Sequence, residues 1–142
     1  MTEKVLLVDD EEDFLEIMSE RMEARGMEVT TCASAIDAVK MIKSKTFDAI
    51  ILDFMMPGMD GFQALKEIKA KHPESQIILL TGHATVEKSV EAMKMGATDF
   101  LEKPADIEAL EKKIKEASAR RMLIVEKETE KRIKDVIRRI GG

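Results

Sequence analysis

The chain has 142 residues, of which 44% are hydrophobic and 36% are charged, and its formal net charge is −5. This composition predicts one globular domain with a modest core and excludes a disordered or fibrous protein. No apolar run approaches the roughly 20 residues that cross a bilayer, and the acidic N-terminus is unlike a secretory signal peptide. The single cysteine, Cys32, cannot form an internal disulfide, so we expect a cytoplasmic protein with Cys32 in its core.

Short apolar runs alternate with helical patterns along the chain. The runs are rich in β-branched residues, and glycines stand at the intervening turns. The expected strands are residues 4–9, 27–32, 48–53, 76–81 and 97–101. The expected helices are residues 11–25, 34–45, 60–71, 85–95 and a last one from 106 onward. This alternation predicts an α/β fold, a doubly wound, flavodoxin-like sheet of five parallel strands in the order 2-1-3-4-5.

The segment after the fifth expected strand predicts an unusually long helix. Residues 106–140 contain neither Gly nor Pro, and apolar or small residues recur at steps of three and four. A helix of about 35 residues would be about 50 Å long, of which the sheet can cover only about half. We therefore expect residues 1–120 to form the globular domain and residues 121–142 to form a helical extension, with no separate further domain.

The extension differs from the body in charge and in surface. Residues 107–142 hold 11 Lys/Arg against 7 Asp/Glu, whereas the first 106 residues carry a net charge of −9. We expect the distal half of the helix to fold back or to pack against another chain. A solvated, charged tail is the alternative, but branched apolar residues such as Leu123, Ile133 and Ile137 favour a homodimer or a docked partner, because their exposure would promote aggregation.

Polar side chains stand at the ends of four of the expected strands. Asp9 and Asp10 end the first strand, Asp53 the third and Thr81 the fourth, and Lys103 follows the fifth. Because the carboxyl ends of parallel strands share one edge of a sheet, we expect these five side chains to gather there. Three carboxylates at one place repel one another unless a cation lies among them. Oxygen ligands of this kind suit Mg²⁺, with Mn²⁺ as a second option.

Asp53 is the candidate nucleophile, since a carboxylate can attack a phosphoryl group and hold it as an acyl phosphate. Thr81 can offer a hydroxyl, and Lys103 an ammonium, to the phosphoryl oxygens. Each residue has an ordinary alternative as a strand-end acid, a strand terminator or a solvated loop lysine, and acids also favour the first turn of a helix. Those alternatives do not explain polar residues at four successive strand ends.

These strand ends resemble those of the response-regulator receiver domains of bacterial two-component signalling. The segments that carry the resemblance are VDDE, LDFMMPGMDG, LLTGHA and DFLEKP. It covers residues 3 to about 120, and the stretch LTGHATVEKSVEAMKMGATDFLEKP is most similar to receivers of the nitrogen-regulation type.

The resemblance implies a phosphoacceptor site with a bound cation. Asp53 matches the residue that takes a phosphoryl group from the phosphohistidine of a sensor histidine kinase. Asp10 matches a direct metal ligand and Asp9 an acid that contacts metal-bound water. Asp53 itself and the backbone carbonyl of Met55 complete the protein ligands of Mg²⁺.

The resemblance also implies a conformational switch. Thr81 matches the switch hydroxyl, Phe100 takes the place of the switch aromatic, and Lys103 matches the lysine that contacts the phosphoryl group. Phosphorylation is then expected to alter the surface of the fourth helix, fifth strand and final helix, and so to control a partner or dimerisation. Such a domain is not an enzyme in the usual sense, because it catalyses only its own phosphorylation and slow dephosphorylation.

Several alternatives stay open on the sequence alone. The chain could be the receiver part of a longer transcriptional regulator, or a phosphorelay or phosphate-sink intermediate. An aspartate-based phosphatase is disfavoured, because that class has an Asp-x-Asp motif and Asp53 is followed by Phe54 and Met55. In the extension, acids interleave with the basic residues, so we expect neither specific nucleic-acid binding nor a membrane contact.

Overall fold

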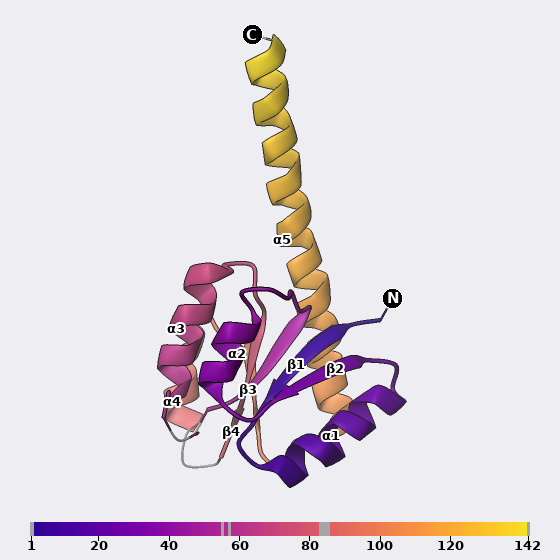
Figure 1. The fold of residues 1–142 in the computed structure, drawn as a ribbon, viewed down its shortest axis with the longest axis vertical. Coiled ribbons are helices and arrows are strands. Elements are labelled where there is room, and N and C mark those ends of the chain that lie inside the picture. Colours follow the sequence, from indigo (N-terminus) through magenta and orange to yellow (C-terminus); the bar gives the residue numbers. More distant parts are fainter. Residues whose placement is uncertain (1, 55, 57, 83–85, 142) are drawn as a thin grey trace.

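Alternating strands and helices build a parallel sheet with helices on both faces (Figure 1). The structure is a computed structural model that describes residues 2–54, 56, 58–82 and 86–141. In this part of the chain the strands are β1 (Lys4–Val8), β2 (Glu28–Cys32), β3 (Ala49–Asp53), β4 (Ile77–Thr81) and β5 (Asp99–Glu102). The helices are α1 (Glu12–Ala24), α2 (Ala35–Met41), α3 (Gly61–Lys71), α4 (Val86–Lys94) and α5 (Ile107–Gly141).

The strands are parallel and follow the order β2-β1-β3-β4-β5, which confirms the predicted doubly wound topology. β1 and β3 are neighbours at the point where the strand order reverses. Ligands of such sheets bind there, outside the carboxyl ends of the strands. The register places Leu52 beside Val8 and Asp53 beside Leu80, so β3 ends about level with β1 and β4.

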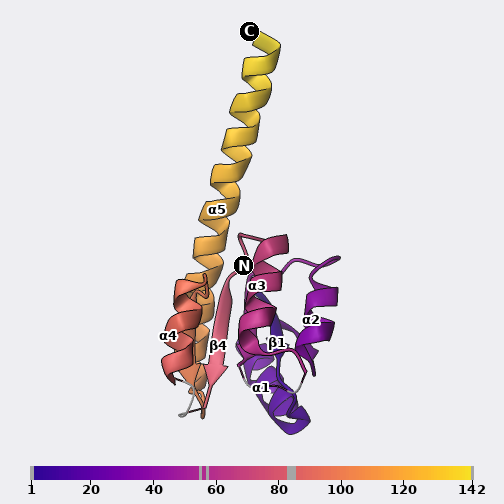
Figure 2. The same cartoon turned by 90° about the vertical axis from the view of Figure 1, so that its left-hand side faces the viewer.

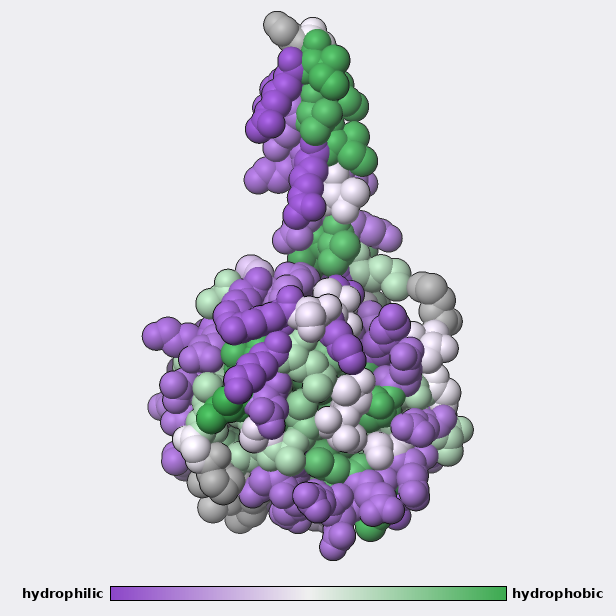
Figure 3. Space-filling model, viewed as in Figure 1, coloured by the Kyte–Doolittle hydropathy of each residue, from purple (hydrophilic) through white to green (hydrophobic). Residues whose placement is uncertain are grey.

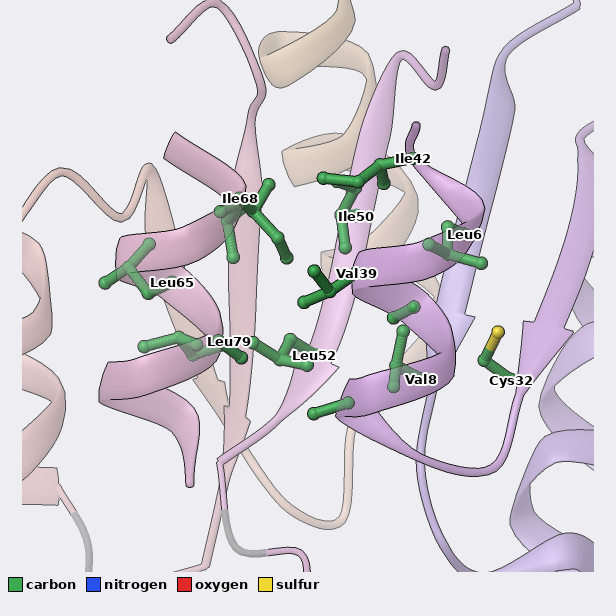
Figure 4. Close-up of a cluster of buried hydrophobic side chains, with 14 of the residues drawn as sticks. Leu6, Val8, Cys32, Val39, Ile42, Ile50, Leu52, Leu65, Ile68 and Leu79 are labelled. Carbon is green, nitrogen blue, oxygen red and sulfur yellow. The ribbon is translucent and has the colours of Figure 1, made fainter. Parts of the chain in front are cut away.

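Successive residues of each central strand point to opposite faces, and both faces are buried. One face carries α2, α3 and α4, whose apolar side chains meet Leu6, Val8, Ile50, Leu52 and Leu79 (Figure 4). The other face carries α1 and α5. Each fully buried Leu or Ile contributes about 1.5–3 kcal/mol of transfer free energy. The continuous apolar runs of the sequence are therefore the strands that have no solvent face.

Cys32, at the end of β2, is 6% exposed, which confirms its predicted place in the core. Burial, with a smaller contribution from the charge of Asp37, raises the pKa of the Cys32 thiol. Less thiolate forms at neutral pH as a result, so this cysteine is a small core residue rather than a reactive group.

Element ends differ from the predictions by a few residues. α2 ends at Met41, although the sequence predicted a helix to residue 45. The N–H groups of Lys43 and Ser44 bond three residues back, to Lys40 and Met41, which tightens the chain after Met41. The side chain of Ile42, the next residue, is buried in the core.

α5 is one continuous helix of 35 residues, as its length of sequence without Gly or Pro predicted. Its buried residues are Leu110, Ile114 and Ala117, all in the first third of the helix. Arg121 reaches Asp48 at 3.5 Å, and beyond this ion pair the helix projects away from the sheet (Figures 1 and 2). The distal half therefore does not fold back, which was one of the two expected arrangements, because nothing in its sequence breaks the helix. None of the described helices is both long enough and apolar enough to span a bilayer.

Candidate functional site

Three carboxylates converge at the carboxyl ends of β1 and β3. Asp9 and Asp10 follow β1 directly, and Asp53 is the last residue of β3. One oxygen from each of the three lies within 4.8 Å of the others. Asp9 is fully buried and Asp53 is 6% exposed, whereas Asp10 is exposed. The structure thus brings together the acids that the sequence predicted to meet.

The carboxylate of Asp9 accepts two hydrogen bonds. Its Oδ1 accepts the N–H of Glu11 at 2.9 Å, and its Oδ2 accepts a bond from Lys103 Nζ at 2.6 Å. The N–H of Asp9 donates to the carbonyl of Cys32 at 3.1 Å, which ties the turn after β1 to the end of β2. The Glu11 N–H and the Lys103 ammonium together therefore fix the orientation of the Asp9 carboxylate.

Lys103 lies among several negative groups. Its Nζ is 3.7 Å from Asp53 Oδ2 and 4.0 Å from Glu11 Oε1, and it stands 4.6 Å from the centre of the Phe14 ring. Burial lowers the pKa of Lys103, but the hydrogen bond that Lys103 donates to Asp9 and the charges of Asp53, Asp9 and Glu11 outweigh this effect and raise the pKa above its usual value. Lys103 is therefore fully charged at neutral pH.

The sum of these charges is negative. Three carboxylates and one ammonium leave two negative charges in a largely buried site, which a divalent cation would neutralise. The donors are hard oxygens from few residues. This donor set fits Mg²⁺, which keeps several waters and leaves positions for phosphoryl oxygens. The Asp cluster lies where the sequence predicted it.

Thr81 and Phe100 lie on β4 and β5, the next two strands of the sheet after β3. Thr81 ends β4, is fully buried, and accepts the N–H of Lys103 at 2.7 Å through its backbone carbonyl. Its hydroxyl Oγ1 has no hydrogen-bond partner among the described residues. A buried hydroxyl without a partner costs about 1–3 kcal/mol. Phe100, in β5, is half-buried and packs against the core on the α2–α4 face.

Two contacts of Lys103 were not predicted from the sequence. Asp9 is its hydrogen-bond partner, and Phe14 provides an aromatic face. β1 and β5 are not neighbours in the sheet, so no pairing pattern in the sequence indicates the contact between Asp9 and Lys103. Phe14 lies in the first turn of α1, four residues after Asp10. Met55, the expected carbonyl ligand, lies outside the described residues.

The chain matches the response regulator receiver domain family over residues 5–115. It is 40% identical over 102 residues to a putative response regulator NtrX-like of Rickettsia bellii, covering 70% of this chain and 21% of that protein. It is 36% identical over 104 residues to the DNA-binding transcriptional regulator NtrC of Escherichia coli K12, covering 73% of this chain and 22% of that protein. These relatives confirm the predicted similarity to receivers of the nitrogen-regulation type.

A solved structure supports the same assignment. The receiver domain protein of Clostridium thermocellum superposes with a TM-score of 0.83 and 33% identity, covering 86% of this chain and 98% of that one. The chain spans only about a quarter or less of the length of the curated relatives it matches. The sheet order, the acidic cluster and these matches together show that the chain belongs to the response regulator receiver domain family of two-component signalling.

Proposed function

We propose that Asp53 accepts a phosphoryl group from the phosphohistidine of a sensor histidine kinase. The observation that carries this proposal is the convergence of three carboxylates within 4.8 Å, with Lys103 Nζ 3.7 Å from Asp53 Oδ2. Asp9, Asp10 and Asp53 would hold Mg²⁺, together with the backbone carbonyl of Met55. The bound cation would neutralise charge on the phosphoryl oxygens during transfer.

The chain's own residues supply orientation and charge. A carboxylate oxygen of Asp53 forms the new bond to phosphorus while the bond between phosphorus and the imidazole nitrogen breaks. Lys103 is already charged and near Asp53, so it can follow the phosphoryl oxygens with a small displacement from Asp9. Positioning and charge neutralisation of this kind account for most of the catalysis in phosphoryl transfer. The domain is not a conventional enzyme, since the phosphoryl group remains on its own residue.

The switch that follows depends on Thr81. Its buried hydroxyl has no partner among the described residues, so a phosphoryl oxygen on Asp53 would be a new acceptor for it. Movement of Thr81 toward that oxygen would open space for Phe100 to turn inward. The surface of α4, β5 and α5 would change in consequence, and a ligand that bonds only one of two arrangements shifts the population toward it.

The domain boundaries and the cellular location of the protein are also proposals. Residues 1–120 form the receiver and residues 121–142 its helical extension, a division supported by the buried residues of α5, which end at Ala117. We place the protein in the cytoplasm, where a kinase could phosphorylate it and where a lone thiol such as Cys32 stays reduced. This chain has no surface that we assign to specific nucleic-acid recognition.

A second candidate function follows from length. The chain covers 22% of a relative described as a DNA-binding transcriptional regulator, and 26% of another described as a transcriptional regulatory protein. In this second function the receiver is the input part of such a regulator, with α5 leading to an output domain. A phosphorelay intermediate remains the alternative in which the phosphoryl group passes to another protein.

Substitution of Asp53 tests the proposed function. We expect the wild type to gain one phosphoryl mass when incubated with Mg²⁺ and a small-molecule phosphodonor, and Asp53→Asn to gain none. Asp13→Asn is the matched control, because Asp13 is an exposed acid in the first turn of α1. Intact-protein mass spectrometry reads both results. Phosphorylation of Asp53→Asn to the wild-type extent would show that the acceptor is a different residue.

A further inference from the structure

The projecting part of α5 carries a continuous apolar stripe. Its members are exposed or only partly covered by the body, and they recur at steps of three and four residues. We define the stripe as Met122, Val125, Thr129, Ile133, Val136 and Ile140. At 3.6 residues per turn these six positions fall within a sector of about 80° over a length of about 27 Å. Figure 3 shows the apolar atoms running along this part of the helix beside a hydrophilic edge.

The spacing of the stripe suits pairing of straight helices. Met122 and Ile133, Val125 and Val136, and Thr129 and Ile140 are each separated by 11 residues. An 11-residue repeat has about 3.67 residues per turn, close to that of an undistorted helix, so the stripe stays on one face. Ile133 is 53% exposed and Ile140 is 83% exposed, which is more apolar surface than a lone helix keeps without a partner.

The one polar member of the stripe is compatible with burial. The Thr129 hydroxyl donates to the carbonyl of Val125 at 2.9 Å, within the same helix. Its donor is therefore satisfied without water, and its methyl group is free to pack. No hydrogen-bond donor in the side chains of the stripe therefore needs water as a partner.

The charges beside the stripe distinguish its two edges. Arg132 lies about 60° from the centre of the stripe on one edge, and Arg139 lies beyond it at about 80°. Arg121 lies on the same side of the helix but is paired with Asp48 of the body. Glu126 lies about 60° from the centre on the opposite edge, and Glu130 lies beyond it. The stripe thus has a basic edge and an acidic edge.

The acids on the basic side lie farther round the helix. Glu128 and Asp135 stand about 100° or more from the centre of the stripe. They precede Arg132 and Arg139 by four residues, a spacing at which an acid and a base interact within one helix. Because they lie farther from the stripe than the arginines do, the edge next to the stripe remains basic.

These edges select one relative orientation for a second copy. When two identical helices lie parallel about a two-fold axis along their length, the basic edge of one faces the acidic edge of the other. When they lie antiparallel, each edge faces its own copy, so arginines meet arginines and glutamates meet glutamates. Opposite charges beside an apolar seam favour the first arrangement, as at the flanking positions of two-stranded coiled coils.

We propose that the distal half of α5 pairs in parallel with the same segment of a second copy of this chain, through the stripe. The pairing goes beyond the proposed function and does not depend on phosphorylation, because the stripe lies beyond Ala117, the last buried residue of α5. The two receiver bodies then stand at the same end of a two-helix stem. α5 is already ordered by its buried first third, so association orders no new backbone.

The oligomeric state gives the first test. We expect the full chain to sediment as a dimer that dissociates on dilution. Ile133→Asp should weaken the dimer by more than about tenfold, because it places a charge in the apolar seam. Leu123→Asp is the matched control, since Leu123 is 58% exposed but lies on the helix face away from the stripe, and it should leave the dimer intact. A wild type that is monomeric at all concentrations, or equal effects of the two substitutions, would overturn the proposal.

Cross-linking gives the orientation. In a parallel pair the two copies of residue 140 lie side by side, whereas in an antiparallel pair they are about 27 Å apart. Ile140→Cys should therefore form a disulfide dimer under mild oxidation, and Arg138→Cys, on the exposed far face, should not. Absence of cross-linking in a dimeric Ile140→Cys, or equal cross-linking of both variants, would contradict the parallel arrangement.

One variant separates this inference from the phosphoacceptor proposal. Asp53→Asn removes the proposed acceptor and leaves α5 unchanged, so it should dimerise as the wild type does. Loss of the dimer in Asp53→Asn would show that the pairing depends on the site and would overturn its independence. A dimeric wild type that takes no phosphoryl group would agree with the pairing of α5 and contradict the proposal that Asp53 is a phosphoacceptor.

Discussion

At the scale of single residues, Lys103 offsets the charge of the acidic cluster. It donates to Asp9 at 2.6 Å and lies 3.7 Å from Asp53. Asp9 has no exposed surface, so removal of its cationic partner would leave a buried carboxylate with uncompensated charge. The contribution of Lys103 is therefore to make three neighbouring acids tolerable before any cation binds.

Lys103→Met should lower the free energy of unfolding by about 1–3 kcal/mol in the absence of Mg²⁺, because a buried charged acceptor loses its partner. It should also increase the stabilisation that Mg²⁺ provides, since the cation then neutralises a more negative site. Urea denaturation with and without Mg²⁺ measures both effects. Lys40→Met, at an exposed position of α2, is the control and should change neither.

The raised pKa of Lys103 sets the sign of a pH effect. A basic group whose pKa is higher in the folded state stabilises the fold. This stabilisation is complete when the pH is below the pKa of the unfolded state, about 10.4 for lysine. We expect the wild type to lose this stabilisation as the pH rises through the folded-state pKa of Lys103. In Lys103→Met, the free energy of unfolding should lack this part of the decrease at alkaline pH. Urea denaturation of both proteins across the alkaline range should show slopes that differ, and identical slopes would contradict the assignment.

At the scale of elements, the turn between β3 and α3 is held by close packing. Asp60 accepts the N–H of Gln63 at 2.8 Å and so caps the start of α3. Gly61 follows at the first position of the helix, where an added Cβ would lie 2.9 Å from the Phe54 ring and 3.0 Å from the Phe54 carbonyl oxygen. Phe54 directly follows Asp53, so this contact fixes where the candidate acceptor stands relative to α3.

Gly61→Ala should therefore destabilise the fold by about 1–3 kcal/mol, the usual cost of forcing extra volume into a packed site. It should also slow phosphorylation of Asp53, because Phe54 must shift to make room. Gly82→Ala is the matched control for stability, since no atom lies within 4 Å of a Cβ built there. Thermal denaturation compares the two variants, and equal melting temperatures would show that the turn accommodates the methyl group.

At the scale of the whole molecule, α5 belongs both to the core of the body and to the part of the chain that projects from it. Leu110, Ile114 and Ala117 complete the core on the α1 face, and the rest of the helix extends beyond the sheet. Arg25 bonds Glu111 at 3.0 Å and Arg121 reaches Asp48 at 3.5 Å, so these ion pairs between α5 and the body are made before residue 122. The body should consequently fold without the projecting part.

A chain that ends at residue 121 should match the full chain within about 0.5 kcal/mol in free energy of unfolding when both are dilute, because the lost residues bury little apolar surface. The full chain should become more stable as its concentration rises, because association stabilises the folded state, and the shortened chain should not. Urea denaturation at two protein concentrations measures this. A shortened chain that unfolds much more easily when dilute would show that residues 122–142 stabilise the body.

The sequence alone was sufficient for the sheet and for the gathering of the site. Strands buried on both faces appear as continuous apolar runs, and a parallel sheet brings all their carboxyl ends to one edge, so Asp9, Asp53 and Thr81 could be placed from their positions at strand ends. The length of α5 also followed from the sequence, because Gly and Pro are the residues that interrupt a helix and residues 106–140 contain neither.

Only the tertiary structure decided how these parts contact one another. Lys103 reaches Asp9 across strands that are not neighbours, α2 ends at Met41, and the Thr81 hydroxyl is left without a partner among the described residues. The direction of distal α5 depends on where the sheet ends beneath it. Local patterns determine secondary structure and burial, whereas these distances depend on the packing of segments far apart in the chain. The alternation of strands and helices was thus determined by the sequence, and the pairing of charges within the site by the fold.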